Sequence, residues 1–124
     1  MTAMNKRISE IGVVPVIKLN NPECDAIPLA KALCEGGVPV AEVTFRAPRA
    51  EMAIRAMREA CPNMLVGAGT VLTKEQVDLS IEVGAQFIVL PGFDAELVTY
   101  CQEKNIPIYP GCTTATDYHT ALKY

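Results

Sequence analysis

The sequence has few of the residues that build metal sites and nucleic-acid surfaces. It has 124 residues with no tryptophan and a single histidine, His119, and its five cysteines form no Cys-x-x-Cys pair. These residues do not supply a usual zinc ligand set, so no metal is expected and the cysteines are interpreted as reduced packing thiols. The net charge of -3 leaves no basic field for nucleic acid or an anionic membrane. We therefore expect a small-molecule site or a protein partner.

Long apolar runs are also missing. No run reaches the length of a membrane span, and the first residues lack the apolar centre of a signal peptide. Half of the chain is nevertheless hydrophobic, which is enough for one modest core. No linker or low-complexity tract divides the chain. We predict one domain over residues 1–124 and a cytoplasmic location.

Strand and helix patterns alternate five times. Apolar runs predict strands at 13–18, 40–45, 64–71, 86–90 and 106–109. A helical pattern follows each strand, and a short helix at 8–11 precedes the first. Asn21, the capping box Thr73 to Gln76, and Asp94 are predicted to open three of the helices. In the helix at 50–60, Met52 is predicted on the apolar stripe.

This alternation predicts a parallel sheet built from βαβ units. The units recur at roughly even spacing, and polar residues gather at strand ends. Both features favour a curled sheet over an open doubly wound one. The predicted fold class is α/β, a (β/α)₈ TIM barrel of which this chain supplies about the first five units.

The strand at 40–45 carries the strongest functional signal. Glu42, Thr44 and Arg46 occupy every second position, so they are predicted to share one face, which we assign to the barrel interior. A carboxyl group in an apolar strand is usually paired or used, because removing a bare charge from water is costly. Two interpretations remain at this point: a Glu42–Arg46 ion pair that orients the strand, or a catalytic acid.

Several motifs in this order and spacing extend from about Val13 to the end of the chain. They are Val14-Pro-Val-Ile17, Gly36-Gly-Val38, Ala41-Glu-Val-Thr-Phe-Arg46, Val66-Gly-Ala-Gly-Thr-Val71, Gly84-Ala-Gln-Phe87, Pro91-Gly92 and Ile106-Pro-Ile-Tyr-Pro-Gly111. Together they resemble the front part of the 2-keto-3-deoxy-6-phosphogluconate / 4-hydroxy-2-oxoglutarate aldolase family. The resemblance implies a (β/α)₈ barrel, usually a trimer, that cleaves a phosphorylated keto-acid to pyruvate and an aldehyde. The implied chemistry uses a lysine Schiff base and needs no metal or other cofactor.

The resemblance also implies roles for three residues. Glu42 matches the family's proton-shuttling glutamate, and an apolar strand is a place where a carboxyl can hold a raised pKa. Arg46 and Thr70 match the residues that bind the keto-acid carboxylate, for which a planar fork and a hydroxyl are suitable. From the residues alone, Thr70 and the glycines at 67 and 69 could equally serve only a turn.

The chain departs from the family pattern at its end. The family's Schiff-base lysine belongs to the sixth strand, in a motif close to Phe-Lys-Phe-Phe-Pro-Ala-Glu, and the sequence ends at Tyr124 before it. We therefore expect the lysine and the phosphate loops to lie beyond this chain, and the chain alone to be inactive. Lys18 is the one lysine predicted near the barrel mouth, but a solvated amine stays protonated and is a poor nucleophile. Five strands cannot close a barrel, so the isolated chain is expected to associate or to be partly disordered.

Two other functions stay open. One is another phosphate-binding barrel enzyme, such as a thiamine-phosphate synthase-like protein or an isomerase. The other is a catalytically silent half-barrel that acts only as an assembly module. For the aldolase, the expected partners are a keto-acid substrate, pyruvate and further copies of the chain, with no nucleic acid and no membrane.

Overall fold

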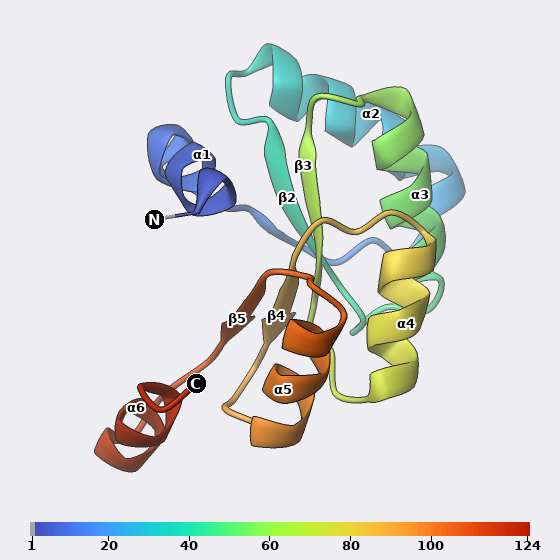
Figure 1. The fold of residues 1–124 in the computed structure, drawn as a ribbon. Coiled ribbons are helices and arrows are strands. Elements are labelled where there is room, and N and C mark those ends of the chain that lie inside the picture. The colour runs from blue at the N-terminus through green and yellow to red at the C-terminus, as the bar shows by residue number, and fades with distance from the viewer. Residues whose placement is uncertain (1) are drawn as a thin grey trace.

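Helices and strands alternate along the chain in the computed structural model, which describes residues 2–124 (Figure 1). The strands are β1 (Val16–Ile17), β2 (Val40–Thr44), β3 (Leu65–Gly69), β4 (Ile88–Leu90) and β5 (Ile108–Pro110). The helices are α1 (Ala3–Ile11), α2 (Pro22–Glu35), α3 (Ala50–Ala60), α4 (Lys74–Glu82), α5 (Ala95–Glu103) and α6 (Ala115–Ala121). Each strand is hydrogen-bonded in parallel to the next in the order β1-β2-β3-β4-β5. This is the arrangement predicted for the first five units of a (β/α)₈ barrel.

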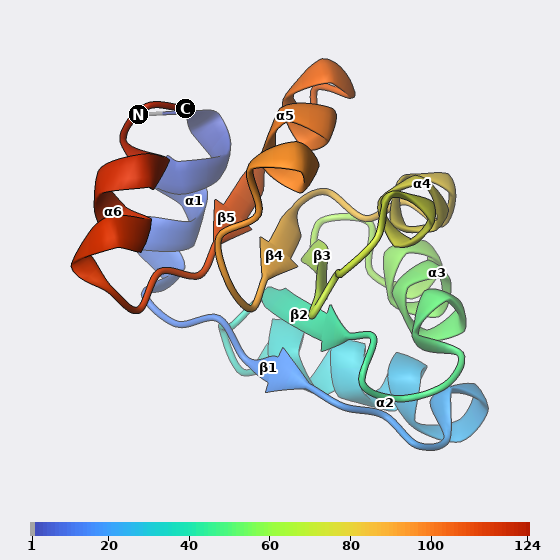
Figure 2. The same cartoon turned by 90° about the horizontal axis from the view of Figure 1, so that it is seen from below.

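The sheet is curled, and its two faces have different covers. Helices α2 to α5 lie on the convex side in Figure 2. Beneath them the outward-facing strand residues are buried in the main core, as Ala41 and Val43 of β2 and Ala68 of β3 illustrate. Buried strands of this kind read as apolar runs in the sequence, which is why they could be predicted. Within residues 2–124, no helix is long and apolar enough to cross a bilayer.

Helix α1 covers part of the concave face. Its Met4 and Ile8 pack against a cluster of inner-face side chains that includes Phe87, the residue just before β4. The Arg7 guanidinium donates a hydrogen bond to the carbonyl oxygen of Asn63, just before β3 begins. These contacts place α1 over the end of the sheet where β3 starts, so this end is closed by apolar side chains.

The helix starts lie at the predicted capping residues, but two of the predicted capping interactions differ: Asn21 makes no side-chain capping bond, and the box at Thr73 is incomplete. The Thr73 hydroxyl accepts a hydrogen bond from the backbone N–H of Gln76 at 3.2 Å. The Gln76 side chain does not complete the predicted capping box, because its Oε1 accepts from the N–H of Leu72 at 2.7 Å. A reciprocal box forms instead at α6, between Thr114 and Asp117.

Replacing Asp94 with alanine is expected to lower the free energy of unfolding by about 1 kcal/mol. The Asp94 carboxylate accepts hydrogen bonds from the N–H groups of Glu96 and Leu97, at 2.9 and 3.0 Å, which otherwise have no partner at the start of α5. Asn21 is a matched control, because it occupies the N-cap of α2 but makes no side-chain capping bond. Urea unfolding of Asp94→Ala and Asn21→Ala should show the larger loss for Asp94→Ala. Equal losses would contradict this account.

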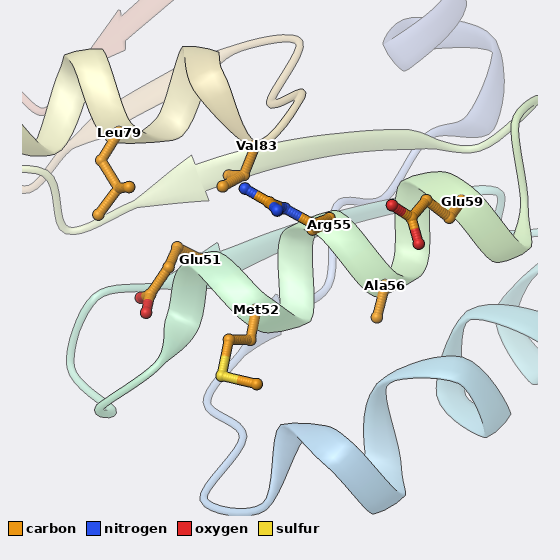
Figure 3. A pocket seen from close by; sticks show the side chains of 7 residues that line it. All are labelled: Glu51, Met52, Arg55, Ala56, Glu59, Leu79 and Val83. Carbon is orange, nitrogen blue, oxygen red and sulfur yellow. The ribbon is translucent and has the colours of Figure 1, made fainter.

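Several details differ from the sequence-based expectations, among them helix α1, which begins at Ala3 and not at residue 8. Strand β1 spans only Val16–Ile17, which is shorter than predicted. Met52, predicted on the apolar stripe of α3, is 42% exposed. The buried residues of α3 are Ala50, Ala53, Ile54 and Met57, which recur at i, i+3, i+4 and i+7. The stripe is therefore rotated toward Ile54, and Met52 lines an outer hollow of about 350 Å³ between α3 and α4 (Figure 3).

Candidate active site

Glu42 is the one carboxylic acid among the described residues that line an apolar cavity on the concave face of the sheet. It lies in the middle of β2 and faces this cavity of about 220 Å³, as its place in the strand predicts. The other lining residues are Ile8, Val14, Phe87, Val89 and Tyr109. The Tyr109 hydroxyl donates to Asn5 of α1, so it already has a partner. The cavity thus presents one carboxyl group among apolar and aromatic side chains.

Two glycines of β3 make room for this arrangement. A Cβ atom at Gly69 would overlap the Oε1 atom of Glu42, and one at Gly67 would overlap the ring of Phe87. Both glycines lie inside β3, and neither has a positive φ. The interpretation of these glycines as turn residues is therefore wrong, because they allow side chains of neighbouring strands to lie against the backbone.

The surroundings of Glu42 favour its protonated form. Burial raises the pKa of the Glu42 carboxyl above its ordinary value, and the positive charge of Arg46 partly opposes this shift. A carboxyl group with a raised pKa can both donate and accept a proton closer to neutral pH. This property suits a group that transfers protons repeatedly during a reaction.

The raised pKa of Glu42 predicts a pH dependence of stability. Because the folded protein holds this proton more tightly than the unfolded chain, the contribution of Glu42 to stability is fully present below the unfolded pKa. It is lost as the pH rises through the folded pKa. Glu42→Gln should therefore gain stability relative to the wild type as the pH is raised from 4 to 7, measured by urea unfolding. The prediction would be contradicted if the difference in unfolding free energy between Glu42→Gln and the wild type stayed constant over this pH range, or if the variant lost stability relative to the wild type.

Arg46 and Thr70 lie at the carboxyl ends of adjacent strands. Arg46 is exposed in the turn after β2, and Thr70 is partly buried directly after β3. The backbone N–H of Phe45 donates to the carbonyl of Gly69 at 2.9 Å, which holds the two segments side by side. Thr70 has a φ of 55°, in the left-handed region that is uncommon for residues other than glycine. Such backbone strain occurs often at functional sites.

The side chains of these residues are not engaged in direct bonds with one another. Among residues 2–124, neither Arg46 nor Thr70 makes a side-chain hydrogen bond, and the ion pairs do not include Glu42 with Arg46. The interpretation of Glu42 and Arg46 as an ion pair that only orients the strand is therefore wrong. Thr44 does have a structural bond, because its hydroxyl donates to the carbonyl of Ile17 in β1 at 3.1 Å.

Sequence reasoning did not assign a role to Phe87 or Tyr109, and it considered Gly69 only as a turn residue. Phe87 and Tyr109 pack edge to face, with ring centroids 5.9 Å apart, and form one wall of the cavity. The sequence does contain a signal that could have pointed to Gly69. Glycine occupies every second position at the end of this strand, and the neighbouring strand carries a carboxyl on one face. Among the described residues, no group of three or more histidine, cysteine or acidic side chains could hold a metal ion.

Comparison with known proteins identifies the family to which the chain is related. The sequence model of one family, described as KDPG and KHG aldolase, matches residues 4–124. The chain belongs to the KDPG and KHG aldolase family.

Relatives in this family match most or all of the chain but are longer. The chain is 44% identical over 124 residues to the 2-dehydro-3-deoxy-phosphogluconate aldolase of Treponema pallidum, covering all of this chain and 59% of that protein. A structure of KDPG aldolase from Legionella pneumophila, with pyruvate captured as a covalent carbinolamine intermediate, superimposes with a TM-score of 0.83 and 39% identity. That match covers 89% of this chain and 53% of the Legionella chain.

A third similarity is to a chain in a designed protein cage. That cage was made by fusing symmetric oligomeric domains, and the match has a TM-score of 0.80 and 32% identity. It covers 89% of this chain and 41% of the cage chain. Our chain therefore spans about half the length of the family members it matches.

Proposed function

We propose that this chain supplies the first five βα units of a Schiff-base aldolase that cleaves 2-keto-3-deoxy-6-phosphogluconate or 4-hydroxy-2-oxoglutarate to pyruvate and an aldehyde. The observation that carries the proposal is the position of the Glu42 carboxyl. It rests against Gly69 on the concave face of the sheet, in an apolar cavity that raises its pKa. Membership of the family supports the same reaction.

Glu42 acts as the proton carrier in this proposal. Formation and hydrolysis of a Schiff base require protons to move on and off the carbinolamine oxygen, and the enamine must be protonated at carbon to release pyruvate. A single carboxyl with a raised pKa can serve these transfers in turn. The surrounding side chains of Phe87 and Val89 limit water in the cavity, which strengthens the electrostatic effect of each transfer.

Arg46 and Thr70 bind the keto-acid carboxylate in this proposal. The guanidinium offers a planar pair of donors that matches a carboxylate, and a threonine hydroxyl adds a further donor. Both side chains follow strands that end at the same edge of the sheet, held together by the bond from Phe45 to Gly69. A substrate bound there would have its reactive carbon directed toward Glu42.

The amine nucleophile is proposed to come from a segment that follows Tyr124. No lysine is among the residues that line the Glu42 cavity. Lys18 is exposed after β1, where its amine is solvated.

Borohydride trapping with pyruvate tests the proposal. We expect no reduced adduct on the 124-residue chain and one adduct on a polypeptide that continues past Tyr124 with the remaining units. Digestion and mass spectrometry locate the modified lysine, and Lys18→Arg in the longer polypeptide is the control that should leave the adduct unchanged. An adduct at Lys18 would overturn the assignment of the amine. A longer polypeptide that forms no adduct would contradict the Schiff-base reaction itself.

We also propose that the assembled protein is one barrel domain per chain and forms a homotrimer. The unpaired outer edges of β1 and β5 in the described part of the sheet, and the similarity to a chain used as a building block of a symmetric cage, support association. Size-exclusion chromatography with light scattering should give a mass above that of one chain. A compact monomer that melts cooperatively would contradict association. The cytoplasmic location stays a prediction.

A further inference from the structure

Tyr109 connects helix α1 to the cavity that holds Glu42. Its hydroxyl donates a hydrogen bond to the Oδ1 atom of Asn5 in α1 at 2.5 Å, although 104 positions separate the two residues in the sequence. Its ring lines the cavity on the side of β5. The bond to Asn5 therefore sets where this ring lies relative to the carboxyl.

One further aromatic side chain links the Tyr109 ring to Glu42. Tyr109 packs edge to face on Phe87, with the two ring planes at 78°. The Phe87 ring lies directly against Gly67, where a Cβ atom would come within 2.2 Å of the ring atom Cε2. Gly67 of β3 is the residue that pairs with Glu42 of β2. A continuous series of contacts thus runs from Asn5 through both rings to the strand position beside the carboxyl.

The two rings differ in how firmly they are held. Phe87 is buried in a cluster with Val40 and Leu65, so close packing fixes its position. Tyr109 is only partly buried, and its hydroxyl reaches the exposed side chain of Asn5. The hydrogen bond to Asn5 is therefore the directional contact that holds the outer part of this aromatic wall in place.

We propose that Tyr109 is a positioning residue for Glu42, whose bond to Asn5 holds the Tyr109 and Phe87 rings against the cavity and keeps the carboxyl among apolar atoms. Tyr109 does not contact the reacting atoms in this role. Its effect on rate rests on the proposed aldolase function, whereas its effect on the carboxyl can be measured without any reaction.

The groups around the carboxyl explain why the apolar enclosure matters. Helix α1 contributes Ile8 to the lining and β4 contributes Val89, and both are apolar. Tyr109 is the other titratable group of the lining, and burial raises the pKa of its hydroxyl, so it is uncharged at neutral pH. Arg46 is the charged residue that acts on Glu42, and it favours the carboxylate. Apolar enclosure is thus what favours the protonated carboxyl.

Removal of the Tyr109 hydroxyl tests the proposal. Tyr109→Phe keeps the ring but loses the bond to Asn5, so water reaches the Glu42 carboxyl and its titration midpoint should move to lower pH. Carbon-13 NMR of labelled glutamate follows the titration in the polypeptide that continues past Tyr124, and Glu42→Gln identifies the signal. Asn5→Ala, at an exposed position, should move the midpoint in the same direction. An unchanged midpoint in either variant would overturn the proposal.

Tyr100 provides the matched control. Its hydroxyl in α5 donates to the two carboxylate oxygens of Asp78 in α4, at 2.8 and 3.0 Å, on the convex side of the sheet (Figure 2). Tyr100→Phe should lower the free energy of unfolding, as Tyr109→Phe does, but leave the Glu42 midpoint unchanged. A merely structural role for Tyr109 predicts an unchanged midpoint in both variants. An equal shift of the midpoint in Tyr100→Phe would overturn the assignment.

Exchange of the methyl protons of pyruvate gives a second readout. Tyr109→Phe should slow exchange at saturating pyruvate by roughly 2- to 12-fold, the equivalent of one lost hydrogen bond, because a weaker base removes the proton less readily. The KM for pyruvate should stay within about twofold, since Arg46 and Thr70 are untouched. A raised KM with an unchanged maximal rate would overturn the proposal. Without exchange in the wild type, the proposed reaction would fall, and the titration would still decide the role of Tyr109.

Discussion

Exchange of the methyl protons of pyruvate with solvent is expected to slow by about 10²- to 10⁴-fold when Glu42 is replaced by glutamine. The amide keeps the shape of the side chain and avoids placing a charge in the apolar cavity. It cannot accept a proton, so in the proposed reaction the step between imine and enamine would lose its base. Proton NMR of pyruvate in D₂O, with the polypeptide that continues past Tyr124, measures the rate.

A carboxyl outside the cavity provides the control for this experiment. Glu51 lies on α3 and lines the outer hollow between α3 and α4, on the opposite side of the sheet (Figure 3). Glu51→Gln should leave the exchange rate within about twofold of the wild type, in line with the small effects of most surface changes. An unchanged rate in Glu42→Gln would remove Glu42 from the reaction.

Replacing Gly69 with alanine is expected to have the second largest effect. The new methyl group would occupy the space of the Glu42 Oε1 atom, so either the carboxyl moves or β3 shifts. Displacement of a reacting group by about 1 Å can cost about 10²-fold in rate. Overpacking of this kind also destabilises by about 1 to 3 kcal/mol. Exchange kinetics and urea unfolding measure the two effects separately.

A double mutant shows whether the kinetic effect of Gly69→Ala acts through Glu42. In the Glu42→Gln background, adding Gly69→Ala should slow exchange little further, because the two changes affect one group. Gly92→Ala is the matched control: a Cβ atom there meets nothing within 4 Å and its φ is not positive. That control should change the unfolding free energy by less than about 0.5 kcal/mol. A full additional loss in the double mutant would show that Gly69 serves only the packing of the strand.

The positions of the strands and most helices could be predicted because the signals are local. Proline at position 22, the capping residues and the apolar runs each depend on a few neighbouring residues. The direction of the Glu42 side chain could also be predicted, because alternation along a strand needs only the strand itself. The buried face of α3 was harder to predict, because it depends on packing against a neighbouring helix. Helix α2 packs beside α3, and the buried stripe of α3 includes Ile54 and not Met52.

The role of Gly69 could not be predicted because it depends on pairing between strands. In the sheet Glu42 is opposite Gly67 and Thr44 is opposite Gly69, and this register sets which β3 residue lies beneath the carboxyl. A shift of two residues would keep every side chain on the same face yet place Glu42 over a different residue. The Glu42–Arg46 ion pair could not be excluded from the strand pattern for a different reason: β2 ends at Thr44, and the turn carries Arg46 away from strand geometry.

Helix α1 influences the acid–base chemistry of the Glu42 carboxyl without supplying an acid or a base itself. Ile8 forms part of the floor beneath the Glu42 carboxyl, and Met4 shields Phe87 beside it. If this helix were to detach, water would enter from below and the proton affinity of the carboxyl would fall toward that of a glutamate in solution. Changes near the first residues would then alter turnover in the proposed reaction while leaving Arg46 and Thr70, the proposed carboxylate-binding residues, in place.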